Sequence, residues 1–146
     1  MKIVVAFSSP KRSAKTVEAA ARQAKATNAE LVLLRIVPDP EKVGVVAQLI
    51  STDRPMDTAQ NQIDETVARL KEQGINASGL VKRGEVARGI MKTAEELKAD
   101  LVFVGTTNIE KRPAFLMKKD PIVHYLVDHC PISLCLVRRD FPPEEP

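Results

Sequence analysis

Glycine and residues with a hydroxyl side chain follow two apolar runs in this sequence. Residues of these types bind anions at the edge of a parallel sheet. Gly105, Thr106 and Thr107 close one such run, and Ser8 directly follows another. A strand, a glycine turn and a helix in this order place backbone N–H groups at a helix N-terminus, where an anion is stabilised. The sequence therefore predicts a sheet edge that is suited to an anionic ligand.

A basic segment separates these residues from the next helix. Lys111, Arg112, Lys118 and Lys119 fall within 108–120, and connections of this length are often functional. The four cations could bind a phosphate by charge instead of through glycine backbone. The alternative is a solvated loop, because charged runs usually face water.

Two interpretations apply to Ser8 and Ser9. At the carboxyl end of the first strand, a serine hydroxyl could contact a ligand. Alternatively, the serines cap the first helix, because serine followed by proline is typical of a helix start. The second interpretation is favoured and predicts a helix that begins at Ser9-Pro10 and ends near Thr27.

The remaining polar side chains do not form a catalytic or metal-binding pattern. His124 and His129 are five residues apart, whereas a pair of ligands on one helix face is usually spaced by three or four. Cys130 and Cys135 are the two cysteines, too few for a disulfide framework or for a metal site of their own. No Ser-His-Asp arrangement or paired carboxylate stands out, so we expect no catalytic centre and no metal.

Five short apolar runs alternate with amphipathic segments and define the fold class. Continuous runs of this kind are typical of parallel strands that helices cover on both faces. The alternation predicts an α/β domain with an open, doubly wound sheet of five parallel strands. The third run is the weakest and predicts an edge strand. The predicted strands cover residues 2–7, 30–37, 75–82, 100–105 and 132–137.

Length and composition fit one ordinary domain. The chain has 146 residues, 44% of them hydrophobic, and we expect a single domain over 1–140 with a frayed tail over 141–146. The net charge of +3 and the 3% content of aromatic residues argue against nucleic-acid binding. No apolar stretch approaches the length of about 18 residues that a membrane span needs, and a reducing, cytoplasmic setting is expected.

The chain resembles the universal stress protein (UspA-like) family over nearly its full length. The resemblance depends on the stretch 81–105 and on 120–137, which matches the closing helix and strand of the family without a gap. It implies a Rossmann-like, adenine nucleotide alpha hydrolase-like fold with strand order 3-2-1-4-5. It also implies a homodimer formed by antiparallel pairing of the last strand, Ile132 to Arg138. The residues that match the family pattern in the first stretch are Gly84, Ile90, Ala94, Asp100, Leu101 and Gly105.

The chain keeps only part of the glycine motif of the nucleotide-binding family members. That motif is Gly, two residues, Gly, nine residues, and then Gly with Ser or Thr. Gly105 matches the first glycine, Asn108 stands at the second, and Asp120-Pro121 replaces the last pair after a spacer of eleven residues. Asp120 adds negative charge where a phosphate would lie, and Pro121 has neither an N–H nor a hydroxyl. ATP binding is therefore expected to be weakened or lost.

The resemblance also implies which residues would hold ATP or another adenine nucleotide if one binds. Ser8 stands where nucleotide-binding relatives carry an Asp, and Val37 ends the second strand. The implied binding residues are Ser8, Val37, Gly105, Thr106, Thr107, Asn108 and Ile122.

Two functions follow from these observations. The first is a non-catalytic, dimeric, cytoplasmic stress-response protein that contacts an unidentified protein partner and needs no cofactor. The second is a nucleotide-binding switch or weak ATPase that uses Gly105 and the basic loop 108–120 for the phosphates. The altered Gly-Ser pair favours the first. In the same loop, Phe115, Leu116 and Met117 would either fill the vacant nucleotide cleft or pack against a partner subunit.

Overall fold

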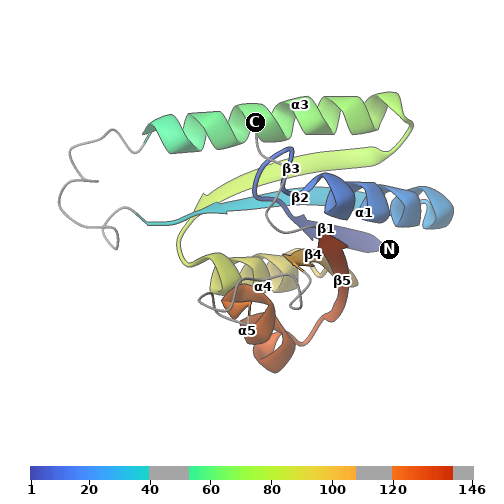
Figure 1. Ribbon diagram of the computed structural model, residues 1–146. Coiled ribbons are helices and arrows are strands. Elements are labelled where there is room, and N and C mark those ends of the chain that lie inside the picture. Colours follow the sequence, from blue (N-terminus) through green and yellow to red (C-terminus); the bar gives the residue numbers. More distant parts are fainter. Residues whose placement is uncertain (40–52, 108–119, 140–146) are drawn as a thin grey trace.

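The computed structural model describes residues 1–39, 53–107 and 120–139 (Figure 1). Within these ranges strands and helices alternate along the chain, which confirms the predicted α/β class. The elements are β1 (Lys2–Ala6), α1 (Ala14–Thr27), β2 (Glu30–Val37), α3 (Asp53–Glu72), β3 (Asn76–Arg83), α4 (Val86–Glu96), β4 (Leu101–Thr107), α5 (Pro121–His129) and β5 (Ser133–Arg139).

The strands form one parallel, five-stranded sheet in the order β3-β2-β1-β4-β5. This is the predicted order, with β3 at one edge and β5 at the other. The chain moves outward from β1 through β2 to β3 and then returns to place β4 on the other side of β1. At such a reversal the crevice outside the carboxyl ends of the strands is the usual ligand site of an α/β sheet.

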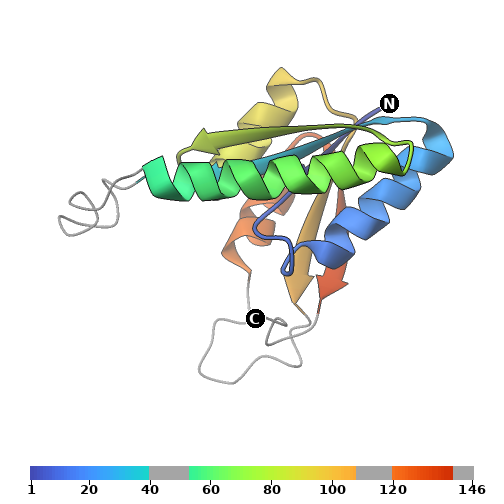
Figure 2. The same ribbon diagram turned by 90° about the horizontal axis from the view of Figure 1, so that it is seen from above.

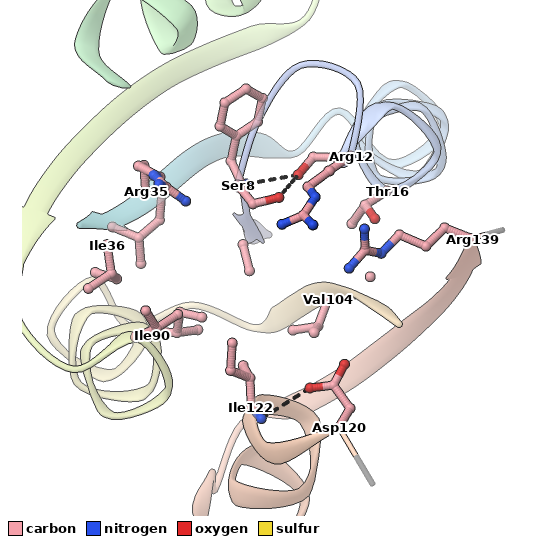
Figure 3. A pocket seen from close by; sticks show the side chains of 16 residues that line it. Ser8, Arg12, Thr16, Arg35, Ile36, Ile90, Val104, Asp120, Ile122 and Arg139 are labelled. Atoms are coloured by element: carbon pink, nitrogen blue, oxygen red, sulfur yellow. Dashed lines mark hydrogen bonds between the residues drawn. The ribbon is translucent and has the colours of Figure 1, made fainter. Parts of the chain in front are cut away.

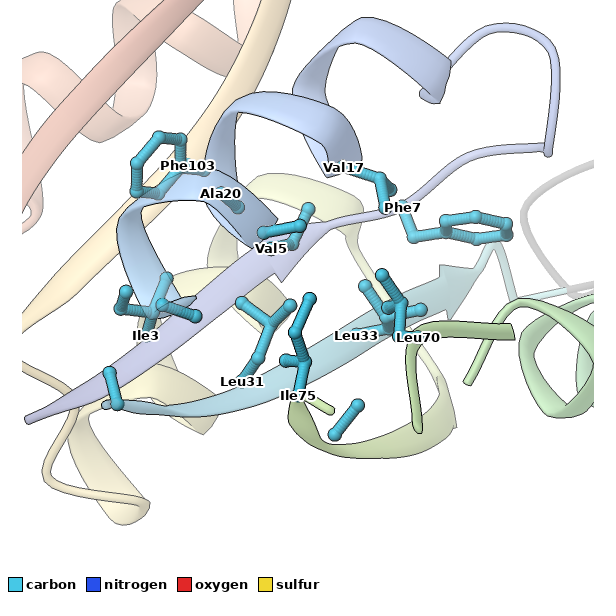
Figure 4. Packing of buried hydrophobic residues seen from close by; sticks show 14 of the residues in the cluster. Ile3, Val5, Phe7, Val17, Ala20, Leu31, Leu33, Leu70, Ile75 and Phe103 are labelled. Carbon is cyan, nitrogen blue, oxygen red and sulfur yellow. The ribbon is translucent and has the colours of Figure 1, made fainter. Parts of the chain in front are cut away.

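Two hydrophobic cores lie on opposite faces of the sheet, because successive side chains of a strand point to alternate sides. Ile3 and Val5 of β1 face the core beneath α1 and α3, which Figure 4 shows from close by. Val4 faces the second core, beneath α4 and α5. All three side chains are 0% exposed, so β1 is the centre of the molecule. Figures 1 and 2 show the two helix layers with the sheet between them.

Glycines allow two of the helices to approach the sheet closely. A Cβ on Gly79 of β3 would overlap the side chain of Ile63 on α3. A Cβ on Gly89 of α4 would lie 2.9 Å from Cδ1 of Ile36 on β2. Gly79 therefore needs the absence of a side chain for the observed packing, whereas a side chain at Gly89 would require the end of the Ile36 side chain to shift.

The first helix begins later than the sequence predicts. α1 starts at Ala14 with Ser13 as its N-cap residue, not at Ser9-Pro10. Ser9 Oγ instead accepts a hydrogen bond from Arg12 N at 3.2 Å, and Ser9 O accepts one from Ser13 N at 2.9 Å. The serine thus stabilises a turn ahead of the helix, which leaves Arg12 on that turn.

The last helix, α5, has a narrower buried face than its apolar residues predict. Pro121 lies in the first turn, where a proline fits because no N–H is needed there. Leu126 is 0% exposed, whereas Val127 is 59% exposed, because adjacent residues of a helix point about 100° apart. Within the ranges that the structure describes, no helix is long and apolar enough to cross a membrane.

Candidate functional site

A cleft lies at the carboxyl ends of β1, β2 and β4, with α1 on one side and α4 and α5 on the other (Figure 3). We call it the β1–β4 cleft. Its volume is about 110 Å³, and a more open hollow adjoins it at Ser8, Ser9, Arg12 and Arg35. The lining residues are Ala6, Phe7, Ser8, Arg12, Ser13, Thr16, Leu34, Arg35, Ile36, Val86, Ile90, Val104, Gly105, Asp120, Ile122 and Arg139.

One wall of the cleft is apolar. It is formed by Ile36 at the end of β2, Ile90 on α4, Val104 on β4 and Ile122 on α5 (Figure 3). All four residues belong to or pack against the core beneath α4 and α5, which holds the wall in place. An apolar ring or chain of a ligand would be removed from water against this surface.

Asp120 occupies the N-terminus of α5 with its own carboxylate. Its Oδ1 accepts hydrogen bonds from Ile122 N at 3.1 Å and from Val123 N at 3.2 Å. Its Oδ2 accepts a longer bond of 3.4 Å from Thr106 Oγ1. A carboxylate in this position satisfies free N–H groups and is stabilised by the helix dipole. The groups that would bind a phosphate at this helix are therefore already engaged.

The hydroxyl groups of Ser8 and Ser13 face each other across the entrance to α1. Ser8 N donates a hydrogen bond to Ser13 Oγ at 2.8 Å, and the two hydroxyl oxygens are 3.2 Å apart. Ser8 therefore does not cap the helix by its own side chain. It ties the end of β1 to the start of α1 and presents its hydroxyl to the cleft (Figure 3).

Gly105 leaves room for two polar side chains. It lies within β4, opposite Val137 of β5, and a Cβ at this position would be 2.6 Å from Thr16 Oγ1 and 3.8 Å from Arg139 Nε. The glycine predicted to bind phosphate through its backbone is thus also required for the close approach of Thr16 on α1, whereas the 3.8 Å separation from Arg139 is an ordinary contact.

Three guanidinium groups line the cleft and bring positive charge to it. Arg12 comes from the turn before α1, Arg35 from β2 and Arg139 from the end of β5 (Figure 3). Burial lowers the pKa of Arg35 below its ordinary value, and the nearby charge of Arg12 lowers it further. Arginine remains protonated at physiological pH even so. Among the described lining residues, Asp120 is the one carboxylate.

The structure brings together part of the predicted binding set. Ser8, Gly105 and Ile122 all line the β1–β4 cleft. Thr106 is buried at 4% exposure next to the cleft, and its hydroxyl is directed to Asp120.

The other predicted residues lie elsewhere or outside the described part. Val37 is buried at the end of β2 and does not line the cleft, and its carbonyl accepts a hydrogen bond from Gly84 N at 3.0 Å. Thr107 is the last residue of β4. Asn108 and the segment 108–119, with its basic and apolar side chains, lie outside the described residues.

The sequence reasoning missed the arginines and Thr16. Arg35 gave the one available signal, since it is a charged residue inside the otherwise apolar run of β2. Arg12 and Arg139 gave none, because they belong to segments that only the folded chain brings to one place. Thr16 falls in the first turn of α1, where a threonine gives no sequence signal of a role in a binding site.

The geometry of the described His, Cys, Asp and Glu side chains does not support a metal site or a redox role. In the described part of the chain, no group of three or more His, Cys, Asp and Glu side chains could hold a metal ion. Cys130 and Cys135 are both free thiols and half-buried. His124 is exposed and its Nε2 lies 3.3 Å from Oδ2 of Asp128.

Comparison with solved structures finds the same fold in several proteins. A universal stress protein family member from Burkholderia pseudomallei superposes with a TM-score of 0.73 at 19% identity, over 93% of this chain and 94% of the other. UspA from Lactobacillus plantarum gives 0.75 at 19%, over 94% and 97%. The universal stress protein from Archaeoglobus fulgidus in complex with dAMP gives 0.69 at 15%, over 94% and 97%.

The sequence itself gives a family assignment. No curated protein matches the chain in sequence. The model of the universal stress protein family, however, matches residues 1–138, which include every described strand and helix except the last residue of β5. The chain therefore belongs to the universal stress protein family.

Proposed function

We propose that this protein is a non-catalytic, cytoplasmic stress-response protein that acts as a homodimer and in which ATP binding is weakened or lost. One observation carries the proposal: the Asp120 carboxylate accepts the Ile122 and Val123 N–H groups at the N-terminus of α5. An ATP phosphate at this place would lie close to a fixed negative charge. Two unit charges about 4 Å apart repel by about 4 kcal/mol at an effective dielectric of about 20.

The first prediction is that ATP does not stabilise the protein. We expect no change in Tm with ATP, ADP or AMP at millimolar concentration, with or without Mg²⁺, in a thermal-shift titration. A ligand at about 100 times its Kd would raise the free energy of unfolding by about 2.7 kcal/mol. For a chain of this size each kcal/mol raises Tm by about 2–4 °C, so such binding would be visible.

A clear shift with ATP would support the second candidate, a nucleotide-binding switch or weak ATPase. A specific observation keeps this candidate in view, since the cleft combines an apolar wall with positive charge and the Archaeoglobus fulgidus relative is described in complex with dAMP. Phosphate release measured in the same samples would then separate a switch from an ATPase.

The dimer proposal concerns the edge strand β5. Within the described residues β5 pairs with β4 alone, and Leu136 on it is 40% exposed. Antiparallel pairing of Ile132 to Arg138 with a second copy would cover this edge. A two-fold axis through the middle of that segment passes at Cys135, so the two Cys135 side chains would face each other.

The second prediction is therefore a thiol cross-link at Cys135. Directly opposed residues of antiparallel strands have Cβ atoms about 4.5–5.5 Å apart, close enough for a short bismaleimide or copper-catalysed oxidation. In the variant Cys130→Ser, which keeps only Cys135, we expect a covalent dimer on a non-reducing gel. The matched control Cys135→Ser keeps only Cys130 and is expected to remain uncrosslinked. A dimer mass by light scattering without any cross-link would contradict this register, and a monomer mass would contradict the dimer.

A further inference from the structure

Arg35 has a polar atom without a partner at the open hollow beside the β1–β4 cleft. Its Nε is buried and has no hydrogen-bond partner among the described residues, although such groups are costly and rare in native proteins. The half-buried side chain lines both the cleft and the hollow, whose volume is about 370 Å³. Figure 3 shows it beside Ile36, at the β2 side of the cleft. A hydrogen-bond acceptor that enters the hollow would therefore meet the Arg35 side chain.

The surroundings of Arg35 indicate that this acceptor is negatively charged. Burial lowers the pKa of Arg35, and the charge of Arg12 lowers it further, yet the guanidinium keeps its proton at physiological pH. Among the described residues that line the hollow there is no carboxylate. Arg12 already takes part in another interaction, which leaves Arg35 as the cation of the hollow without a described partner. A carboxylate is the side-chain group that pairs best with a guanidinium.

The chain supplies carboxylates at the edge of the same cleft. β5 ends at Arg139, whose side chain lines the cleft. Residues 140–146, which lie outside the described part, contain Asp140, Glu144 and Glu145 and no basic residue. An anionic segment thus follows directly on the strand that ends beside the cleft.

The length of this segment matches the distance from β5 to β2. All strands of the sheet are parallel, so β5 and β2 end at the same edge, three strand spacings apart. At about 4.8 Å each, these spacings give about 14 Å. The Pro142-Pro143 pair favours an extended backbone, and five extended residues at about 3.1 Å each cover about 15 Å. The fifth residue after Arg139 is Glu144, so the two glutamates are the carboxylates that can reach Arg35.

We propose that residues 140–146 cross the mouth of the β1–β4 cleft and that the carboxylate of Glu144 or Glu145 pairs with the Arg35 guanidinium. Figure 3 shows Arg139 and Arg35 on opposite sides of this cleft, with Arg12 between them. The segment then acts as an autoinhibitory contact, because a molecule that binds in the cleft first has to displace it. This contact replaces the expectation of a frayed tail over 141–146. It goes beyond the proposed function and does not depend on whether ATP binds.

A zero-length carbodiimide cross-link in the full chain tests the contact. The variant Arg35→Lys places a primary amine at the hollow, and carbodiimide joins an amine to a carboxylate in contact with it, with loss of water. We expect peptide mass spectrometry to find an amide between position 35 and Glu144 or Glu145 within one chain. The matched control Arg83→Lys carries its amine at an exposed position at the end of β3, one strand beyond β2. It should give at least a tenfold lower yield with the same glutamates.

The Nε–H signal of Arg35 in nuclear magnetic resonance gives a second readout that leaves the arginine in place. In the full-length double variant Glu144→Gln, Glu145→Gln we expect hydrogen exchange at Arg35 Nε to accelerate at least fivefold, because the charged acceptor is lost. The matched control Glu65→Gln, Glu72→Gln removes two exposed carboxylates from α3. It should change the exchange rate less than twofold.

An amide at position 35 within one chain, together with faster exchange in the glutamate variant, supports the contact. Equal cross-linking of Arg35→Lys and Arg83→Lys overturns it, as does an exchange rate that the loss of both glutamates leaves unchanged. A cross-link between two chains, seen as a dimer on a denaturing gel, also overturns it, because the carboxylate would then come from a second copy. None of these results alters the expected outcome of the ATP titration.

Discussion

Leu126→Ala is expected to lower the free energy of unfolding by about 2–5 kcal/mol, the usual range for truncating a buried leucine. Leu126 is 0% exposed and lies in the core beneath α4 and α5. It is also the one buried side chain of α5, so its truncation leaves this helix with little to hold it against the sheet. Chemical denaturation followed by circular dichroism measures the change.

The neighbouring residue supplies the control. Val127 lies on the same helix but is 59% exposed, and Val127→Ala should change the free energy of unfolding by less than about 0.5 kcal/mol. Amide hydrogen exchange at Ile122 and Val123 should accelerate in Leu126→Ala and not in Val127→Ala, because α5 carries the Asp120 cap. Equal stability of the two variants would contradict the packing of α5 described above.

The double variant Asp120→Gly, Pro121→Ser is expected to gain ATP binding, with a Kd at least tenfold below that of the unchanged chain. It removes the carboxylate that accepts the Ile122 and Val123 N–H groups and restores the Gly-Ser pair of the family motif. The freed N–H groups and the new hydroxyl can then bind phosphate oxygens. The loss of the Asp120 cap should cost only about 0.3 kcal/mol of stability, because glycine is itself a tolerated N-cap residue, measured in the absence of ligand.

Two single variants separate the effect of the Asp120 charge from the effect of its capping hydrogen bonds. Asp120→Asn keeps a good N-cap residue but removes the charge, and it should recover part of the ATP affinity with little loss of stability. Asp128→Asn removes a charge from the same helix, where Asp128 is exposed and near His124, and it should leave ATP affinity unchanged. If the double variant gains nothing over the unchanged chain, the carboxylate of Asp120 is not what weakens ATP binding.

The fold was largely predictable because the apolar runs that indicate its strands are local features of the sequence and recur along the chain. Buried parallel strands need continuous apolar runs, and the five runs correspond to β1 to β5 in the structure. The start of α1 was predicted wrongly because Ser9-Pro10 resembles a helix start, whereas Ser9 stabilises a separate turn and α1 begins only at Ala14.

The candidate site was predictable only on its α5 side. There the sequence motif names Gly105, Asp120 and Ile122, and all three line the cleft. The α1 side depends on Arg12 and Arg139, which the packing of α1 against β5 brings to the same cleft. Neither residue belongs to a pattern of fixed spacing, so no rule that reads along the chain could join them.

The Asp120 cap has a consequence for how such a protein could respond to the cell. Its carboxylate is attached to the same chain as the N–H groups it contacts, so its local concentration is set by covalent geometry and stays constant. A dissolved nucleotide competes with it only through its own concentration, which rises and falls with energy supply. A nucleotide therefore has to displace the tethered carboxylate before it can reach these N–H groups, which lowers the sensitivity of this helix terminus to adenylate levels.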